Sequence, residues 1–295
     1  MLKIDELYKA VEEKGNVCVG LDTAPEYLPQ DVLSNYDYKS LAVLAYNKAV
    51  IDATRDSAVC YKVQIAYYES LGIAGLSVYS ETLKYIRKRD CISIADIKRG
   101  DIADTAARYA KAHYNGDFEA DFVTLNAYMG MDTLTPWIDE AARLGKGAFV
   151  LLRTSNSGRN DFECAKLENG KMLYETAGAK LQELAALHKG ACGYGSFGAV
   201  AGCTDSQESA AIRKNYDRLF LLIPGYGSQG GGAAEAALLL DKNGNGGIVN
   251  SSRAILKAWE AKDPSISTLQ EAALAANLAA ITMRDEIRAA SKQVR

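Results

Sequence analysis

The chain has 295 residues, of which 48% are hydrophobic and 24% are charged, an ordinary balance for a globular protein. Its 34 Lys and Arg nearly match its 37 Asp and Glu, which leaves a net charge of -3. That balance argues against a protein whose main task is to grip nucleic acid, although it allows a local cationic pocket. The sequence has no apolar run of about 18 residues, so no membrane span is expected.

Residues 1–16 have the pattern of an amphipathic helix that contains acids, unlike a signal or transit peptide. The two histidines, His113 and His188, are expected at exposed helical positions, so chemistry should come from Lys, Asp, Arg and backbone groups. The cysteines are widely spaced without a C-x-x-C pair, which indicates a reduced, cytoplasmic compartment. They are Cys18, Cys60, Cys91, Cys164, Cys192 and Cys203.

Short apolar, β-branched runs then alternate with stretches of helical period. The predicted strands are Asn16–Asp22, Ala58–Ile65, Cys91–Lys98, Asp121–Asn126, Gly147–Arg153, Gly198–Gly202, Leu219–Pro224 and Gly247–Asn250. Predicted helices between them include Ser40–Arg55, Ile102–Lys111, Met131–Leu144, Leu173–His188, Ser206–Asn215 and Ala233–Asp241. Near-continuous apolar strands indicate a parallel sheet covered on both faces. The pattern favours an α/β fold, a (β/α)₈ TIM barrel with an N-terminal helix, over an open doubly wound sheet.

No linker or change of composition divides the chain. We therefore expect residues 1–295 to form a single domain, with a barrel core at about 16–290. The polar segment Ser155–Gly170 follows the fifth predicted strand, and its length favours a lid or a surface insertion.

Polar residues cluster at the carboxyl ends of the predicted strands, where a barrel places its active site. Asp96 and Lys98 lie two apart in the third strand, so both side chains should leave the same face, toward the barrel interior. A buried charged pair needs partners, and Lys62 at the equivalent point of the second strand is available to Asp96. A purely structural ion pair at the barrel mouth remains the alternative. Other polar strand ends are Asp22, Asn126, Arg153–Ser155, Thr204 and Ser251–Arg253.

Two segments match G-x-G-x-x-G. Gly193–Gly198 precedes a strand, which is the wrong order for a dinucleotide site. Gly225–Gly230 follows the seventh strand, and its backbone N–H groups could cradle a phosphate. Arg253 follows the eighth strand, and a guanidinium matches phosphate oxygens, so we expect a monophosphate site there. A plain flexible loop remains the alternative for Gly225–Gly230.

One further motif, Asp241–Gly246, resembles the start of a calcium loop. Ser252 occupies the twelfth position, where a bidentate Glu is needed, so we interpret the segment as a turn into the eighth strand. No metal-ligand cluster and no nicotinamide or flavin motif accompanies these residues, and no metal site is expected.

The motif D-I-K-R-G-D-I at 96–102 resembles that of the orotidine 5′-phosphate decarboxylase family, most closely its longer bacterial-type branch. G-L-D at Asp22, Y-K-V-Q at Lys62, P-G-Y-G-S-Q-G-G at Gln229 and S-S-R at Arg253 add to the resemblance, which spans about residues 16–256. It implies a (β/α)₈ barrel, a homodimer and a cytoplasmic carboxy-lyase. The implied reaction is cofactor-independent decarboxylation of orotidine 5′-monophosphate to UMP and CO₂, the last step of de novo pyrimidine (UMP) biosynthesis.

The resemblance also implies catalytic roles. Lys62, Asp96, Lys98 and Asp101 would form a charged array in which Lys98 protonates C6 and Asp96 faces the substrate carboxylate. Asp101 and Thr105 would reach into the neighbouring subunit's site. A positive charge at C6 suits this reaction, because loss of CO₂ from an sp² carbon leaves a poorly delocalised carbanion.

Substrate-binding roles follow in the same way. Asp22, with Lys62, would hold ribose hydroxyls, and Gln229 and Arg253 would grip the phosphate. Ser155 would read the pyrimidine edge, with the adjacent Thr154 as the alternative. The implied partners are therefore a small-molecule substrate and a second subunit, with neither nucleic acid nor membrane.

Two other functions stay open from the residues alone. A sugar-phosphate lyase or decarboxylase of the same barrel type would use similar Asp and Lys positions around a magnesium-bound enediolate. A non-catalytic nucleotide-binding regulator would keep only the phosphate grip.

Overall fold

A computed structural model gives the structure of the chain and describes residues 1–227 and 230–294. Parallel strands close into a barrel in the order in which they occur along the chain. They are β1 (Val17–Gly20), β2 (Cys60–Gln64), β3 (Ile92–Arg99), β4 (Phe122–Leu125), β5 (Gly147–Arg153), β6 (Phe197–Ala201), β7 (Leu221–Ile223) and β8 (Gly247–Ser251). β1 pairs with both β2 and β8, so the sheet closes on itself. The predicted (β/α)₈ barrel is confirmed, and the open doubly wound sheet is wrong.

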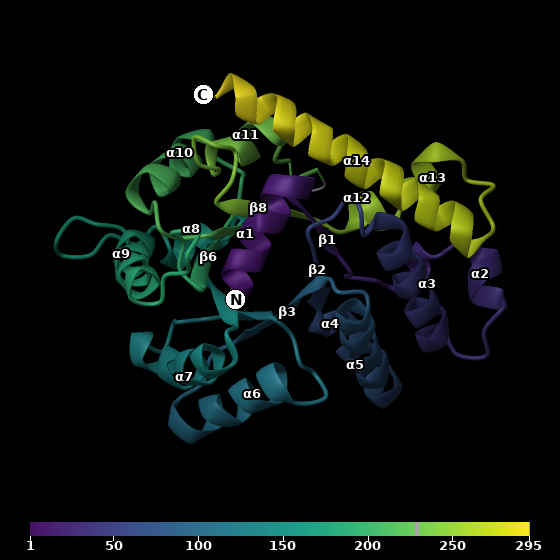
Figure 1. The fold of residues 1–295 in the computed structure, drawn as a ribbon, viewed down its shortest axis with the longest axis horizontal. Helices are drawn as coiled ribbons and strands as arrows, with labels where there is room; N and C mark the ends of the chain where they lie inside the picture. The colour runs from purple at the N-terminus through teal and green to yellow at the C-terminus, as the bar shows by residue number, and fades with distance from the viewer. Residues whose placement is uncertain (228–229, 295) are drawn as a thin grey trace.

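Helices surround the barrel (Figure 1). The longer ones are α1 (Lys3–Lys14), α3 (Lys39–Thr54), α5 (Gly72–Lys88), α6 (Ala103–Asn115), α7 (Thr135–Leu144), α9 (Leu173–Leu187), α10 (Ser206–Asn215) and α14 (Leu269–Gln293). The shorter ones are η1 (Pro25–Tyr27), α2 (Gln30–Ser34), α4 (Ile65–Glu69), η2 (Met131–Leu134), α8 (Arg159–Phe162), α11 (Ala233–Leu238), α12 (Arg253–Leu256) and α13 (Ala258–Lys262). All the predicted helices are present.

The helix predicted over Ala233–Asp241 ends earlier than expected, at Leu238. Asp241 instead begins the predicted turn, in which its Oδ1 accepts hydrogen bonds from the backbone N–H groups of Asn243 (2.7 Å) and Asn245 (2.9 Å). An aspartate that bonds the backbone ahead of it favours a turn over a helix. The turn into the eighth strand is therefore confirmed.

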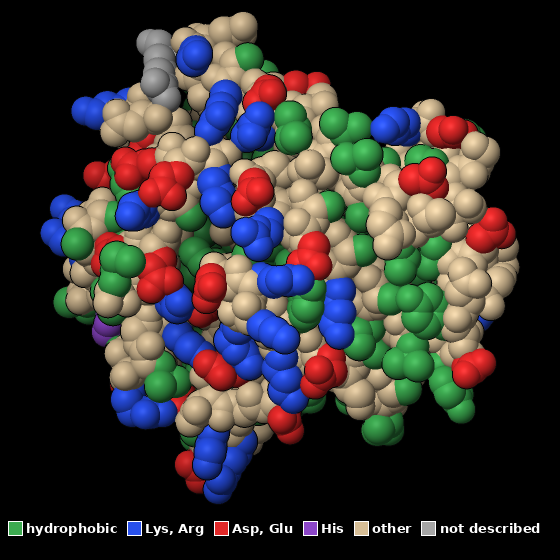
Figure 2. Space-filling view, turned by 45° about the vertical axis from the view of Figure 1, so that its right-hand side comes forward, with side chains coloured by type: hydrophobic (Ala, Val, Ile, Leu, Met, Phe, Trp, Pro, Cys, Tyr) green, Lys and Arg blue, Asp and Glu red, His purple; other side chains and the backbone are tan. Residues whose placement is uncertain are grey.

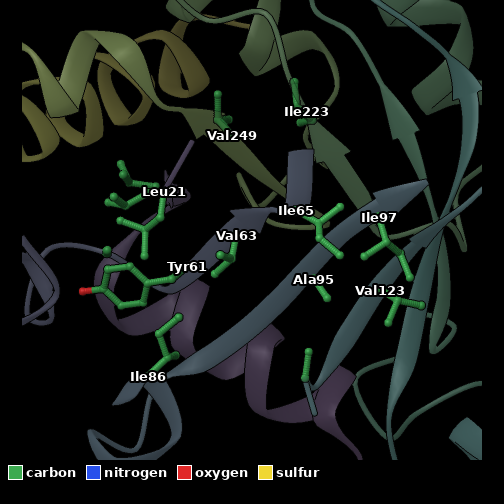
Figure 3. Packing of buried hydrophobic residues seen from close by; sticks show 14 of the residues in the cluster. Leu21, Tyr61, Val63, Ile65, Ile86, Ala95, Ile97, Val123, Ile223 and Val249 are labelled. Carbon is green, nitrogen blue, oxygen red and sulfur yellow. The ribbon is translucent and has the colours of Figure 1, made fainter. Parts of the chain in front are cut away.

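Side chains alternate between two apolar layers along each strand. On β2, Tyr61 and Val63 point outward and pack under the helices with Ala95 of β3, as Figure 3 shows. Cys60, which precedes Tyr61, points to the opposite face and belongs to a separate cluster inside the barrel. The same alternation sends Lys62 inward, which brings its charge into the barrel interior.

The N-terminal helix α1 closes the amino-terminal end of the barrel and lies across its middle in Figure 1. Its Ile4, Leu7 and Val11 join the apolar cluster inside the barrel. Backbone bonds fix α1 there, because the Lys3 N–H donates to the carbonyl of Gly145, just before β5. The interior is therefore apolar and covered at one end, and polar groups gather at the other.

Acidic and basic side chains are interspersed over the face shown in Figure 2, in keeping with the near-balanced composition. Among the described residues, no helix combines the length and the apolar character needed to cross a membrane.

The histidines are not exposed, which corrects the sequence-based expectation. His113 is only 3% exposed and stacks between Phe118 (ring centroids 5.7 Å apart) and Trp137 (6.4 Å). His188 is half-buried against Phe197. His113 follows Ala110 by three residues on the buried face of α6. Because alanines make up much of that face, the sequence does not show it as a clear apolar stripe.

This burial makes His113 a source of pH-dependent stability. Burial, aided by the charge of Arg99, lowers the pKa of His113 to about 4, whereas an unfolded histidine titrates near about 6.5. Between these pH values the unfolded chain binds more protons than the folded chain. The free energy of unfolding should therefore fall as pH falls through this window. Urea unfolding at several pH values gives the free energy of unfolding as a function of pH. The slope of that plot should be shallower for His113→Phe than for wild type. Equal slopes for the two proteins would contradict the prediction.

Candidate functional site

A cavity of about 500 Å³ opens at the carboxyl ends of the strands. Most of the predicted site residues line it, namely Asp22, Lys62, Asp96, Lys98, Ser155 and Arg253. Three other polar strand ends, Asn126, Arg153 and Thr204, are not among its lining residues. The fold thus gathers in one place side chains that are up to 231 residues apart in sequence, from Asp22 to Arg253 (253 − 22).

Asp96 lies at the centre of the site, and its side chain is 7% exposed. Oδ2 accepts hydrogen bonds from Lys62 Nζ (2.9 Å) and Gln64 Nε2 (2.9 Å). Oδ1 accepts from Lys98 Nζ (2.6 Å) and Thr124 Oγ1 (2.8 Å). Two cations and two neutral donors therefore satisfy both oxygens of one buried carboxylate.

The ammonium groups keep this carboxylate charged. Burial acts to raise the pKa of Asp96, but the charges of Lys62 and Lys98 outweigh it and hold that pKa well below its usual range. Asp96 is therefore an anion at neutral pH and an acceptor only, and it could repel a second carboxylate brought against it.

Lys62 extends the network to β1. Its Nζ also lies 3.0 Å from Asp22 Oδ1, and Asp22 Oδ2 accepts a hydrogen bond from Ser252 Oγ (2.9 Å). Burial acts to lower the pKa of Lys62, but the carboxylates of Asp22 and Asp96 outweigh it and raise that pKa. The result is an alternating array of charges, from Asp22 through Lys62 and Asp96 to Lys98.

Lys98 reaches Asp96 by a route that simple strand alternation did not predict. The pairing of β3 with β4 shifts register between Ala95 and Arg99, and Lys98 has φ +45°, in the left-handed region. A non-glycine residue there is strained and needs support from its surroundings. The Lys98 side chain is 45% exposed, so its ammonium is accessible from the cavity.

Arg253, Gly225 and Tyr226 line another part of the cavity, at the ends of strands β7 and β8. The Arg253 side chain is exposed and has no ion-pair partner within 1–227 and 230–294. Gly225 (φ +105°) has a backbone conformation that favours glycine. Gln229, the other predicted phosphate ligand, lies outside the described residues.

The segment after β5 is tied to the barrel. Buried Arg153 forms ion pairs with Glu163 (3.0 Å) and Glu208 (2.8 Å), and the Thr154 hydroxyl donates to Glu163 (2.6 Å). The hydroxyl of Ser155 makes no hydrogen bond within the described chain, and Ser155 lines the cavity. Ser155 is therefore better placed than Thr154 to meet a ligand.

Asp101 and Thr105 stand apart from the others. Neither lines the cavity of its own chain. Asp101 Oδ1 accepts from the backbone N–H of Ile102 (2.8 Å), and Thr105 is exposed on α6. A single chain does not bring these two predicted residues into the array.

Sequence reasoning missed two residues of the network, Gln64 and Thr124, and named Ser252 only as one of the polar strand ends. Gln64 follows Lys62 by two in β2, so alternation could have found it. Thr124, inside the apolar run of β4, and Ser252, just after β8, act across strands. Their contacts depend on strand register, for which the sequence carried no signal.

Comparisons with known proteins identify relatives of this chain. A family model described as "Orotidine 5'-phosphate decarboxylase / HUMPS family" matches residues 15–264. The chain is 54% identical over 260 residues (88% of the chain, 90% of the relative) to the orotidine 5′-phosphate decarboxylase of Clostridium novyi. It is 50% identical over 285 residues (97% and 98%) to that of Clostridium acetobutylicum.

Solved structures are similar over almost the whole chain. A putative orotidine-monophosphate decarboxylase from Toxoplasma gondii superposes with a TM-score of 0.81 at 28% identity, covering 99% of this chain and 98% of that one. The OMP decarboxylase of Leishmania donovani gives a TM-score of 0.76 at 28% identity, with 99% of each chain covered.

Proposed function

The chain belongs to the orotidine 5′-phosphate decarboxylase / HUMPS family, and we infer from this that its cavity converts orotidine 5′-monophosphate to UMP and CO₂. The chain is a decarboxylase of pyrimidine biosynthesis. The observation that carries the assignment is the alternating array from Asp22 to Lys98, which shares one cavity with Arg253. An anionic substrate with a carboxylate and a phosphate matches those charges.

Lys98 is the acid in this proposal. When the bond between C6 and the carboxylate breaks, its electron pair stays on C6, and the Lys98 ammonium stabilises that charge and donates a proton to C6. Asp96 repels the substrate carboxylate before the bond breaks, and departure of neutral CO₂ relieves the repulsion. Lys62 holds Asp96 in place through its 2.9 Å ion pair.

The rest of the cavity binds the substrate. Arg253, with Gln229, grips the phosphate, and this remote binding energy is used to hold the reacting ring in place. Asp22 and Lys62 bind ribose hydroxyls. Ser155 reads the pyrimidine edge, an assignment supported by its unbonded hydroxyl in the described chain.

The proposal extends to assembly and location. Two chains form a homodimer in which Asp101 and Thr105 complete the partner's site, supported by their position outside their own chain's cavity. Residues 1–295 act as one domain, without a cofactor and without nucleic-acid or membrane partners. Work in the cytoplasm is supported by the six cysteines, all of which are free thiols.

The first test is direct turnover. Mixing the protein with orotidine 5′-monophosphate should change the ultraviolet absorbance, and EDTA should leave the rate unchanged.

Lys98→Ala should lower kcat by far more than tenfold while UMP still binds. Retention of more than about a tenth of kcat, a loss below about 1.4 kcal/mol, would rule out Lys98 as the acid. Loss of activity with EDTA would favour a magnesium-dependent lyase, and UMP binding without turnover would favour a regulator.

Arg253→Ala should separate phosphate binding from chemistry. The variant should lose at least about tenfold in kcat/KM for orotidine 5′-monophosphate, because a charged hydrogen bond is lost. The slow decarboxylation of orotidine, which has no phosphate, should stay close to that of wild type. Equal losses on both substrates would make Arg253 a structural residue.

Mixing two inactive variants tests the shared site. In a heterodimer of Lys98→Ala and Asp101→Ala chains, the site on the Asp101→Ala chain keeps its own Lys98 and receives Asp101 from its partner. The other site lacks both residues. Random exchange makes half the dimers mixed, so the pool should regain about a quarter of wild-type activity. If mass spectrometry shows exchange but no activity returns, Asp101 does not act in trans.

A further inference from the structure

The hydroxyl of Thr124 lies beside Asp96 and the backbone of Lys98, at one end of the charged array. Thr124 belongs to β4 and is 1% exposed. Its Oγ1 lies 2.8 Å from Asp96 Oδ1, 3.0 Å from the backbone N of Ile97 and 2.9 Å from the backbone N of Lys98. A single side-chain atom thus contacts three consecutive residues of the D-I-K motif.

These contacts use the hydroxyl completely. A threonine hydroxyl has one proton and two lone pairs. The N–H groups of Ile97 and Lys98 can only donate, so they occupy the lone pairs. The proton must then go to Asp96, which is ionised and can only accept. The direction of every hydrogen bond at Thr124 is therefore set.

The backbone of β3 needs this support. The register of β3 with β4 shifts between Ala95 and Arg99, which takes the N–H groups of Ile97 and Lys98 away from regular strand partners. Buried N–H groups without acceptors are costly. Lys98 also has φ +45°, a conformation that persists only where its surroundings fix it. Thr124 supplies the acceptor at this point.

We propose that Thr124 is a positioning residue that holds the left-handed turn at Lys98 and thereby keeps the Lys98 ammonium beside Asp96. The proposal rests on the proposed function, in which the Lys98 ammonium donates the proton that C6 receives. Thr124 acts through the backbone of Lys98 and the carboxylate of Asp96, because its hydroxyl has no hydrogen-bonding capacity left for substrate.

Thr124→Val removes the hydroxyl at nearly constant volume, and Thr124→Ser keeps it. Because a hydrogen bond to a charged group is lost, we expect Thr124→Val to lower kcat at least about tenfold, with KM and the Kd of UMP changed less than about threefold. Thr124→Ser should return kcat to within about threefold of wild type. Thr54→Val is the matched control, because Thr54 is a buried threonine of α3 whose hydroxyl bonds Val50 and Tyr61, away from the cavity.

Amide hydrogen exchange gives a second readout that does not depend on turnover. In Thr124→Val, the amides of Ile97 and Lys98 should exchange faster than in wild type, whereas those of β1 should not. If Thr124→Val does not fold, the comparison of Thr124→Ala with Thr124→Ser replaces it, with a lower kcat expected for Ala.

Three outcomes would overturn the proposal. They are a wild-type kcat in Thr124→Val, an equal loss of kcat in Thr54→Val, and a loss in Thr124→Ser as large as that in Thr124→Val. A wild-type protein that does not decarboxylate orotidine 5′-monophosphate would instead contradict the proposed function. In that case unchanged exchange at Ile97 and Lys98 would still refute the positioning role.

Discussion

The buried carboxylate of Asp96 is the constraint on which the rest of the site depends. An isolated anion in a barrel interior would be prohibitively unstable, and removing one member of a buried ion pair is strongly destabilising. Asp96 is accommodated because Lys62, Gln64, Lys98 and Thr124 each donate to it. These donors come from β2, β3 and β4, so the electrostatic requirement of one residue links the ends of three strands.

The barrel makes that array effective by separating two environments. Helix α1 covers the amino-terminal end, and its Leu7 packs in the apolar cluster inside the barrel. The charges lie at the other end, where Lys98 remains accessible from the cavity. Fixed charges above an apolar, covered interior act more strongly than they would in water and need little rearrangement when charge develops on a substrate.

The supports of the site differ in how they act. Arg153 and Glu163 anchor the segment that carries Ser155, although neither lines the cavity. Thr124 supports the backbone at Lys98. Among the described residues, Asp101 has no ion pair with the array and lies outside its own chain's cavity, which supports our proposal that it serves the partner's site. The ion pairs that anchor the segment after β5 and the hydrogen bonds that support β3 thus come from different residues.

The sequence by itself determined the barrel and most of the charged array. Apolar runs separated by helices can bury both faces only in a parallel sheet, and such sheets place polar strand ends together. Asp96, Lys98 and Lys62 were therefore identifiable by position. Tertiary structure alone decided the left-handed turn at Lys98 and the hydrogen bonds of Thr124, because these depend on how β3 and β4 are aligned. Strand alternation tells which residues share a face within one strand, but contacts between strands depend on register, which only the closed and packed barrel sets.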